Sequence, residues 1–284
     1  TSAAVAAAPA GPPLSRDDLV KYLRIPDDAV EWKEKLVYDV VRWSGNIVVR
    51  QPLVVAKTGT LALEPGTHVY FDIPAFLSDA QIVPWILVQG KILSLGTPEN
   101  PIVFSSVSLR EDERLDTVSV QSAREARFRR TVFERGGWGI HLHDTPGAEI
   151  AGCTFRDSFG GVRFKCDGLA LTGNLFEKNR IGVRVLDSRD VRFSGNTFRG
   201  NLTGIFFRQG ITVAALEKNN FDNLEYDLKL GEGQSEPLAA PGNWWKAEAE
   251  GGLAERIYDA ADAEGVGHVN IYPTLPAPYA EQKP

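Results

Sequence analysis

The sequence predicts a parallel β-helix, an all-β solenoid, and one stretch of repeats carries most of this prediction. Phenylalanine returns every 21 to 23 residues, at Phe133, Phe155, Phe176, Phe198 and Phe221. Glycine keeps the same period, and an isoleucine or valine follows each time, at Gly139, Gly161, Gly182 and Gly204. Such a period is typical of solenoids, in which each repeat buries its apolar face only against its neighbours.

The secondary structure inside each repeat follows from the spacing of its apolar residues. They alternate, as in Val162 and Phe164, and a period of two indicates a β-strand. A repeat of about 22 residues then holds three short strands joined by corners, with no room for a helix. Asparagine stands two residues before three of the repeat phenylalanines, at Asn174, Asn196 and Asn219, and Cys153 takes this position one coil earlier. We expect the asparagines to stack and to satisfy backbone groups at one corner.

The totals exclude some classes of function. The chain has 284 residues, a net charge of -6 and a pI of about 5.4, which gives no global argument for nucleic-acid binding. No run of 18 apolar residues is present, so we expect no transmembrane helix. Cys153 and Cys166 are the only cysteines. We expect buried free thiols, with a disulfide as the alternative.

The N-terminal part predicts a tether followed by a cap. Residues 1–14 are rich in alanine and proline, and the chain contains no methionine. A tether of this kind often follows a removed signal or a lipid-attachment site, so we expect export and a possible lipid anchor before residue 1, with a trimmed chain as the alternative. Residues 15–44 are predicted to form a helical cap over the open end of the solenoid. Ser15 and Asp18 begin a capping box there, and a second helix is expected around Asp28 to Val41.

The β-helix itself is predicted over residues 45–230. Its first coils, to about Val120, are less regular, and residues 72–85 and 107–117 are expected to be loops. Such loops often carry function and could dock partners, but a solvated surface excursion is the simpler expectation for both. The repeat breaks down after Phe221, so residues 231–284 are predicted to form a C-terminal cap and tail. Trp244 and Trp245 are expected to close the core there rather than to bind sugar.

Three segments resemble one group of known proteins. Residues 59–71 together with 87–104, the repeats at 131–221, and the closing segment that starts with Gly242-Asn243-Trp244-Trp245 resemble secreted bacterial right-handed β-helix proteins, of the pectate-lyase-like and periplasmic copper-binding types. The resemblance covers roughly residues 45–275 and is specific for the fold rather than for an activity. It implies export, to the periplasm, the outer membrane surface or the outside of the cell, and carbohydrate-related ligands, which many members bind. We therefore expect a right-handed parallel β-helix of roughly eight coils.

One outward wall is predicted to balance its own charges. Next to the repeat phenylalanines stand residues whose signs alternate from coil to coil, at Glu134, Arg156, Glu177, Arg199 and Asp222. We call this set the charge ladder. Adjacent coils are about 4.8 Å apart, so each charge has opposite neighbours above and below. We assign the ladder to register and solubility, because exposed pairs contribute only about 0.2–1 kcal/mol each.

A second wall gathers positive charge. Its outward residues are His141, His143, Arg163, Lys165, Arg184, Phe206 and Arg208. We call this set the basic strip. Like charges facing each other across strands repel, and an anionic ligand would relieve the repulsion. The alternative is that Asp144, Asp167 and Asp187, at the next corner, already neutralise the strip.

The basic strip therefore predicts non-catalytic binding of an anionic glycan, another cell-envelope component or an acidic partner protein. A lyase or hydrolase acting on acidic polysaccharide is the alternative, with Arg163, Lys165 and Arg184 as candidate groups and calcium at the corner aspartates. The Arg163-Phe164-Lys165 element superficially resembles the Arg-Ile-Lys element of polygalacturonases, but the rest of that family's pattern is missing. A structural subunit of an envelope assembly is the third possibility. We assign no catalytic residue and no cofactor. We also assign no metal, although His141 and His143 share a face.

Overall fold

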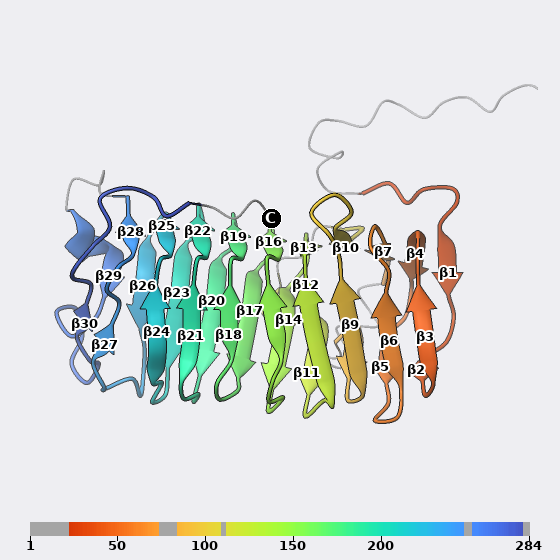
Figure 1. Ribbon diagram of the computed structural model, residues 1–284, viewed down its shortest axis with the longest axis horizontal. Helices are drawn as coiled ribbons and strands as arrows, with labels where there is room; N and C mark the ends of the chain where they lie inside the picture. Colours follow the sequence, from red (N-terminus) through yellow and green to blue (C-terminus); the bar gives the residue numbers. More distant parts are fainter. Residues whose placement is uncertain (1–22, 74–83, 109–111, 247–251, 281–284) are drawn as a thin grey trace, which may run out of the picture.

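The computed structural model describes residues 23–73, 84–108, 112–246 and 252–280. Its strands form three long parallel sheets (Figure 1). The first sheet contains β1 (Val30–Trp32), β4 (Asn46–Val49), β7 (His68–Phe71), β10 (Ile102–Ser106), β13 (Thr131–Glu134), β16 (Thr154–Arg156), β19 (Leu175–Glu177), β22 (Thr197–Arg199), β25 (Asn220–Asp222) and β28 (Trp244–Trp245).

The second sheet contains β2 (Leu36–Val37), β5 (Leu53–Val55), β8 (Ile86–Val88), β11 (Asp116–Gln121), β14 (Trp138–His143), β17 (Gly160–Lys165), β20 (Ile181–Leu186), β23 (Thr203–Arg208), β26 (Tyr226–Leu230) and β29 (Ile257–Tyr258). The third contains β3 (Val40–Trp43), β6 (Thr60–Leu63), β9 (Lys91–Leu95), β12 (Glu125–Arg129), β15 (Glu149–Ala151), β18 (Ala170–Thr172), β21 (Val191–Ser194) and β24 (Val213–Glu217). A short 3-10 helix, η1 (Leu253–Arg256), and a two-stranded sheet of β27 (Leu238–Ala239) and β30 (Val269–Asn270) complete the chain.

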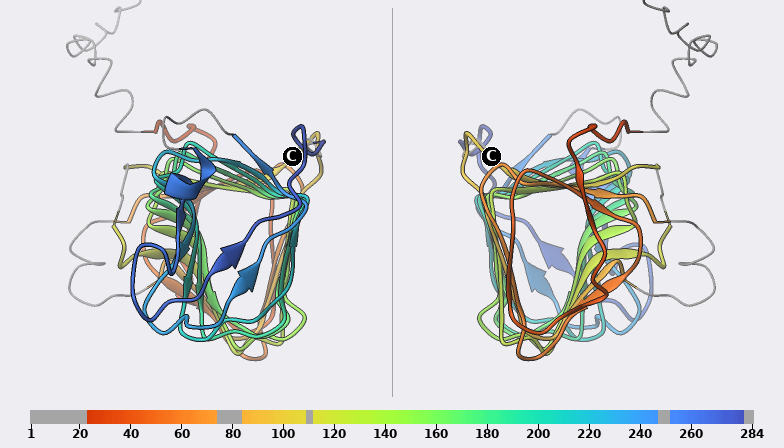
Figure 2. Two further views of the ribbon diagram at one scale, coloured as in Figure 1. Left: turned by 90° about the vertical axis from the view of Figure 1, so that its left-hand side faces the viewer. Right: turned by 90° about the vertical axis from the view of Figure 1, so that its right-hand side faces the viewer.

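The molecule is a right-handed parallel β-helix, as predicted. Consecutive strands enter the three sheets in turn, and each strand pairs with the equivalent strand of the next coil. Seen along the solenoid, the coils lie over one another around a common core (Figure 2). The first and second sheets have ten strands each and the third has eight, so the solenoid is longer than the predicted eight coils.

A column of stacked phenylalanine rings runs through the core. The five repeat phenylalanines are fully buried, and neighbouring ring centroids lie 4.8 to 5.2 Å apart with nearly parallel planes. Phe104 extends the column at one end and Trp245 at the other. The repeat glycine makes room for the rings, since a Cβ on Gly161 would lie 2.6 Å from Phe176. The phenylalanine and glycine periods therefore have one packing cause.

The predicted asparagine corner is confirmed. The Asn174 backbone N–H donates to the side-chain oxygen of Asn196, and Asn196 donates in the same way to Asn219. The ladder continues at both ends, to Cys153 and Asn243. A second ladder, which the sequence analysis missed, joins Asn179, Asn201 and Asn223 at another corner. Both ladders satisfy buried backbone groups that the sheets leave open.

The predicted helix around Asp28 to Val41 is wrong. This segment contains β1, β2 and the start of β3, so the β-helix begins at Val30 rather than at residue 45. Trp32 and Trp43 pack edge to face, 5.5 Å apart, and Val30 pairs with Ile47 of the next coil. Pairing with a neighbouring coil outweighed local helix propensity. Residues 1–14 and the capping box at Ser15 lie outside the described residues. The described part of the predicted cap, residues 23–44, contains no helix.

The C-terminal prediction holds in part. Trp245 is buried and stacks on Phe221 at 4.5 Å, so it closes the core as expected. However, β28 and β29 still pair with the preceding coil, which carries the solenoid past residue 230. Cys153 and Cys166 are buried and free, as predicted, and burial raises the pKa of the Cys153 thiol to about 12. In the described part of the chain, no helix is long and apolar enough to cross a membrane.

Candidate functional site on the second sheet

The structure places the whole basic strip on four adjacent strands of the second sheet. His141 pairs with Arg163, Arg163 with Arg184, and Arg184 with Phe206. His143 pairs with Lys165 in the neighbouring column, and Arg208 pairs with Leu186. The predicted register is therefore confirmed. A groove of about 200 Å³ lies over its β14 to β20 part, lined by His141, His143, Arg163, Phe164, Lys165, Arg184 and Leu186.

A buried aspartate, Asp116, neutralises the middle of the strip. Its side chain is only 7% exposed, and its Oδ1 lies 2.7 Å from Nη2 of Arg163. Asp116 is the first residue of β11, one coil before His141 and level with Trp138. The contact is close but poorly directed for a hydrogen bond, so Asp116 Oδ1 and Arg163 Nε retain unused hydrogen-bonding capacity. The sequence analysis missed Asp116 as a partner of the strip.

The segment before β11 lies against the strip instead of extending into solvent. Leu115 is buried, and its carbonyl oxygen accepts from the Trp138 backbone N–H at 2.8 Å. This close approach requires Gly137, because a Cβ there would lie 2.3 Å from the Leu115 oxygen. The expectation of a solvated excursion over residues 107–117 is thus wrong for its described part after residue 111. Residues 74–83, in the other predicted loop, lie outside the described residues.

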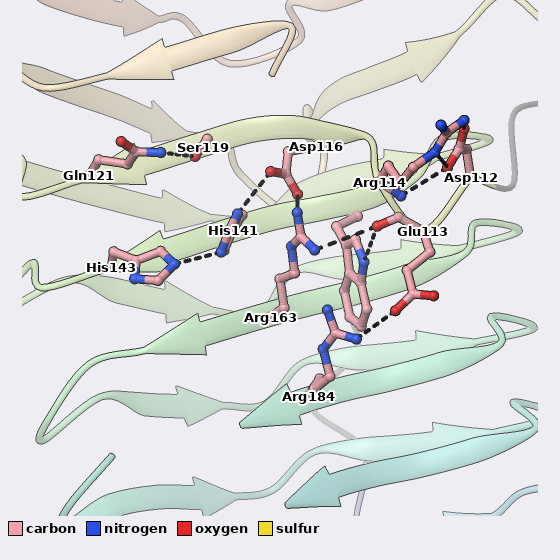
Figure 3. Close-up of polar contacts among 11 residues, drawn as sticks. Asp112, Glu113, Arg114, Asp116, Ser119, Gln121, His141, His143, Arg163 and Arg184 are labelled. Atoms are coloured by element: carbon pink, nitrogen blue, oxygen red, sulfur yellow. Dashed lines mark hydrogen bonds and ion pairs between the residues drawn. The ribbon is translucent and has the colours of Figure 1, made fainter. Parts of the chain in front are cut away.

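Glu113 in this segment holds the other arginine. Its carboxylate lies 2.8 Å from Nη1 of Arg184, and its backbone oxygen accepts from the Trp138 indole N–H at 3.0 Å (Figure 3). The guanidinium carbons of Arg163 and Arg184 lie 5.6 and 4.8 Å from the centre of the Trp138 ring. Burial lowers the pKa of Arg184, the hydrogen bond that Arg184 donates to Glu113 opposes the shift, and the neighbouring Arg163 adds to it. The two cations are crowded, but each has a carboxylate.

The corner aspartates neutralise only one residue of the strip. Lys165 lies 2.6 Å from Asp187, whose hydrogen bond and charge raise the pKa of the lysine. Arg208 has a looser partner, because Glu232 is 3.7 Å away and 88% exposed. Charge repulsion within the strip is therefore largely relieved by the protein itself. Charge repulsion is therefore no argument for an anionic ligand. The two arginines are neutralised chiefly by Glu113 and Asp116.

The two histidines form a chain that ends at Asp116. Nδ1 of His141 lies 2.8 Å from Asp116 Oδ2, and Nε2 of His141 lies 2.7 Å from Nε2 of His143 (Figure 3). A carboxylate only accepts hydrogen bonds, so we assign a hydrogen to Nδ1 of His141. Burial lowers the pKa of His143, His141 and Arg163 add to the shift, and Asp144 and Asp116 oppose it. His143 is therefore neutral at neutral pH.

The far end of the strip is aromatic. Phe206 has Arg208 and Lys229 each 5.8 Å from its ring centre. The Lys229 ammonium also lies 4.9 Å from the ring centre of Tyr226 and 5.1 Å from that of Tyr258. We call these five residues the aromatic end. Lys229 pairs with Phe206 in the column of His141, so extending that column by one coil would have found it.

Metal-binding geometry is lacking where the structure is described. No group of three or more histidine, cysteine, aspartate and glutamate side chains there could hold a metal ion. The pair of His141 and His143 uses its facing ring nitrogens for the contact between the two rings.

Comparison with known proteins supports a β-helix family. Residues 103–233 match the family model described as a right-handed β-helix region. This segment runs from β10 to just beyond β26 and contains every residue of the basic strip. No curated protein and no solved structure matches the chain. The match agrees with the right-handed parallel β-helix fold of the structure.

Proposed function

We propose that the outer face of the second sheet binds an acidic polysaccharide, which crosses the strands from β14 to β26. The observation that carries the proposal is Lys229. Its ammonium lies over three aromatic rings, and no described carboxylate lies within ion-pairing distance of it. An ammonium group that lies over aromatic rings and has no carboxylate partner can pair with a carboxylate or sulfate group of a ligand, while the rings contact the sugar faces.

The shape of the face supports a chain-like ligand. Its strands are parallel and in register, and they repeat about every 4.8 Å, which is close to the length of one sugar unit. Arg208, with its loose partner Glu232, adds a second available cation beside Lys229. The groove over His143 and Lys165 continues the same face toward β14. Sugar units could therefore make similar contacts on successive strands.

Other functions have less support. Hydrolysis of glycosides commonly uses two carboxyl groups placed on either side of the bond, whereas Asp116 and Glu113 both face arginines. A scaffold within the cell envelope is compatible with the fold, since β-helices serve both polysaccharide-acting and structural proteins. A scaffold role does not account for the half-buried Lys229 ammonium over three rings. Export to the cell envelope remains part of the proposal, based on the character of residues 1–14.

The test is a binding measurement at low salt with polygalacturonate, alginate and a neutral glycan. We expect the acidic chains to bind and Lys229→Ala to weaken binding roughly tenfold, the value of one contact of about 1.4 kcal/mol. Lys57→Ala is the control, because Lys57 is an exposed turn residue after β5. Binding should also weaken as salt rises. Failure of both acidic chains to bind, or equal binding by Lys229→Ala, would overturn the proposal.

A further inference from the structure

We infer that the N-terminal end of the solenoid is an interface at which a second copy of this chain binds, end to end and about a two-fold axis. This end is the first coil, which consists of β1, β2 and β3. It is separate from the basic strip, so the inference does not depend on the proposed function. Three features of the first coil lead to it: free strand edges, exposed apolar side chains and a self-complementary set of charges.

All three sheets end at the first coil with an unpaired strand edge. β1, β2 and β3 are the terminal strands of the first, second and third sheets (Figure 1). Each pairs with the next coil on one side, and within the described residues no strand pairs with the other side. An exposed strand edge is a template for pairing with another strand. Here three such edges lie together at one end of the molecule.

The hydrogen bonds of β2 show that backbone groups point out of the solenoid. The N–H groups of Val54 and Ala56 donate to the oxygens of Lys35 and Val37. Backbone groups of successive residues point to opposite sides of a strand. The N–H and C=O of Leu36, which lies between Lys35 and Val37, therefore point away from the next coil. The same reasoning applies to β3, whose bonds to the next coil leave alternate residues pointing outward.

The first coil also leaves apolar side chains exposed. Val30 pairs with Ile47, which lies in the core, so Val30 occupies a core position and is nevertheless 64% exposed. Leu36, Tyr38 and Val40 are exposed as well. Exposed apolar side chains that gather at one place on a protein mark an interaction surface.

The chain covers the opposite end of the solenoid but not this one. At the C-terminal end, Leu238 and Ile271 are buried in the core, and blue segments of the chain cross this end in the left view of Figure 2. Before β1, the Leu23 N–H donates to the Val107 oxygen, and residues 23–29 pack on the outer face of the first sheet. These residues therefore reach β1 from the side and do not cross the first coil.

A second copy of this chain fits the three edges together. A single added strand would pair with one edge only, whereas another first coil presents three edges with the same spacing. Half a turn about an axis perpendicular to the solenoid makes the facing strands antiparallel, which is a stable mode of pairing. If the axis passes through the middle of β2, then β2 faces β2 of the second copy and β1 faces β3. Such an isologous contact is the commonest type in homo-oligomers.

The charges of the first coil are complementary under this rotation. Lys35 and Asp39 lie at equal distances on either side of Val37, so Lys35 of each copy faces Asp39 of the other. Glu31 in β1 and Arg42 in β3 lie at nearly equal distances and also face each other. Opposite charges that face each other across strands stabilise the pairing. Glu31 already pairs with Arg50 at 2.9 Å, whereas Lys35 and Asp39 have no ion-pair partner in the described part of the chain.

The dimer would extend the second sheet across the interface. With β2 facing β2 of the second copy, the second sheets of the two copies form one continuous sheet on the same side of the dimer. Each half carries one basic strip. A ligand long enough to cross the interface would contact both strips, which raises its apparent affinity above that of one strip. Only this consequence rests on the proposed function.

The experiment measures the molar mass of the full chain in solution, by sedimentation, from about 1 to 100 µM. We expect a dimer that dissociates on dilution. Val30→Lys places an ammonium group where the interface would bury it, so the dissociation constant should rise at least about 100-fold. Leu224→Lys is the matched control and should leave the dimer unchanged. Leu224 is 68% exposed and lies between β25 and β26, far along the solenoid from the first coil.

A charge exchange separates this interface from an effect on folding. Lys35→Asp places two pairs of like charges in the interface, one for each copy, and should raise the dissociation constant about tenfold. Asp39→Lys should do the same. The double variant restores opposite charges in both pairs, so its dissociation constant should return toward the original value. Both residues are exposed in one copy, so this exchange also decides the matter if Val30→Lys does not fold.

The outcomes distinguish what covers the end. Hydrogen exchange in the peptide that contains Leu36 should slow as the protein concentration rises, because the Leu36 N–H is bonded only in the dimer. A chain that stays monomeric over the whole range overturns the inference. Slow exchange of that peptide at every concentration would then assign the cover to residues 1–22 of the same chain. A dimer that tolerates Val30→Lys and both single charge reversals also overturns the inference, because it must use another surface.

Discussion

The charge ladder and the basic strip are two outward faces of one solenoid that neutralise their charges in different ways. In the ladder, each arginine finds a glutamate one coil away, as in Arg156 with Glu134 at 2.7 Å and Arg199 with Glu177 at 2.9 Å. In the strip, Arg184 takes its partner from Glu113, which is 71 residues earlier in the chain. The repeat itself supplies the carboxylates that neutralise the ladder, whereas a non-repeating segment supplies the carboxylate that neutralises Arg184 in the strip.

This difference is the reason why we place the proposed function at the strip. A ladder needs only the repeat, so it fixes register without creating any unusual group. The strip depends on the segment before β11, which lies outside the repeat, and on the first residue of β11, Asp116, whose buried carboxylate lies next to a histidine and an arginine. Irregular segments on a rigid solenoid are where binding and catalytic residues commonly arise. The comparison can be tested by removing one charge from each arrangement.

The largest effect is expected for Asp116→Ala. This change leaves Arg163 without its carboxylate in a site where the arginine side chain is only 16% exposed. Breaking a buried pair by removing one partner typically costs about 3–5 kcal/mol. Chemical denaturation should show a loss of this size in the free energy of unfolding. The matched control is Asp222→Ala in the ladder, where Asp222 pairs with the half-exposed Lys246. Equal losses of unfolding free energy in both variants would show that the two faces do not differ in how strongly their charges depend on a buried partner.

Most of the fold could be predicted because the repeat pattern in the sequence corresponds directly to the coils of the solenoid. The period of Phe155, Phe176 and Phe198 fixes which residues face the core, and the same register fixes the columns of the charge ladder. The second asparagine ladder has the same period of 22 and was open to the same search. The first coil could not be predicted in this way, because Val30 to Trp43 has no phenylalanine or glycine in the repeat register.

The strip was predictable as a set of residues but not as a network. Register alone placed His141 beside Arg163, and the structure confirms this. Glu113 precedes β11 and belongs to a segment that occurs once, and Asp116, although in register with Trp138, has no carboxylate at the equivalent position of the next coils. Their charges in the sequence suggested a solvated loop. Only the three-dimensional path of the chain shows that Leu115 is buried and that its neighbours face the strip.

An intermediate effect is expected for Glu113→Gln. Arg184 loses an ion pair with a half-exposed partner, so we expect a loss of about 1 kcal/mol in the free energy of unfolding. The same change releases a cation toward the groove, and binding of polygalacturonate at low salt should therefore become tighter. The control is Glu232→Gln, which removes only the loose partner of Arg208. Weaker binding by Glu113→Gln would mean that the segment contributes contacts to the ligand rather than restraining the arginine.

The smallest effect is expected for Arg199→Ala in the charge ladder. Arg199 is 46% exposed and has a single carboxylate partner, Glu177, one coil away. Solvent screens such a pair, so the loss in the free energy of unfolding should stay below about 1 kcal/mol and shrink further at high salt. Glycan binding should not change, because this residue lies on the first sheet. A loss comparable to that of Asp116→Ala would show that alternating charges, and not only the stacked rings and asparagines, hold the coils in register.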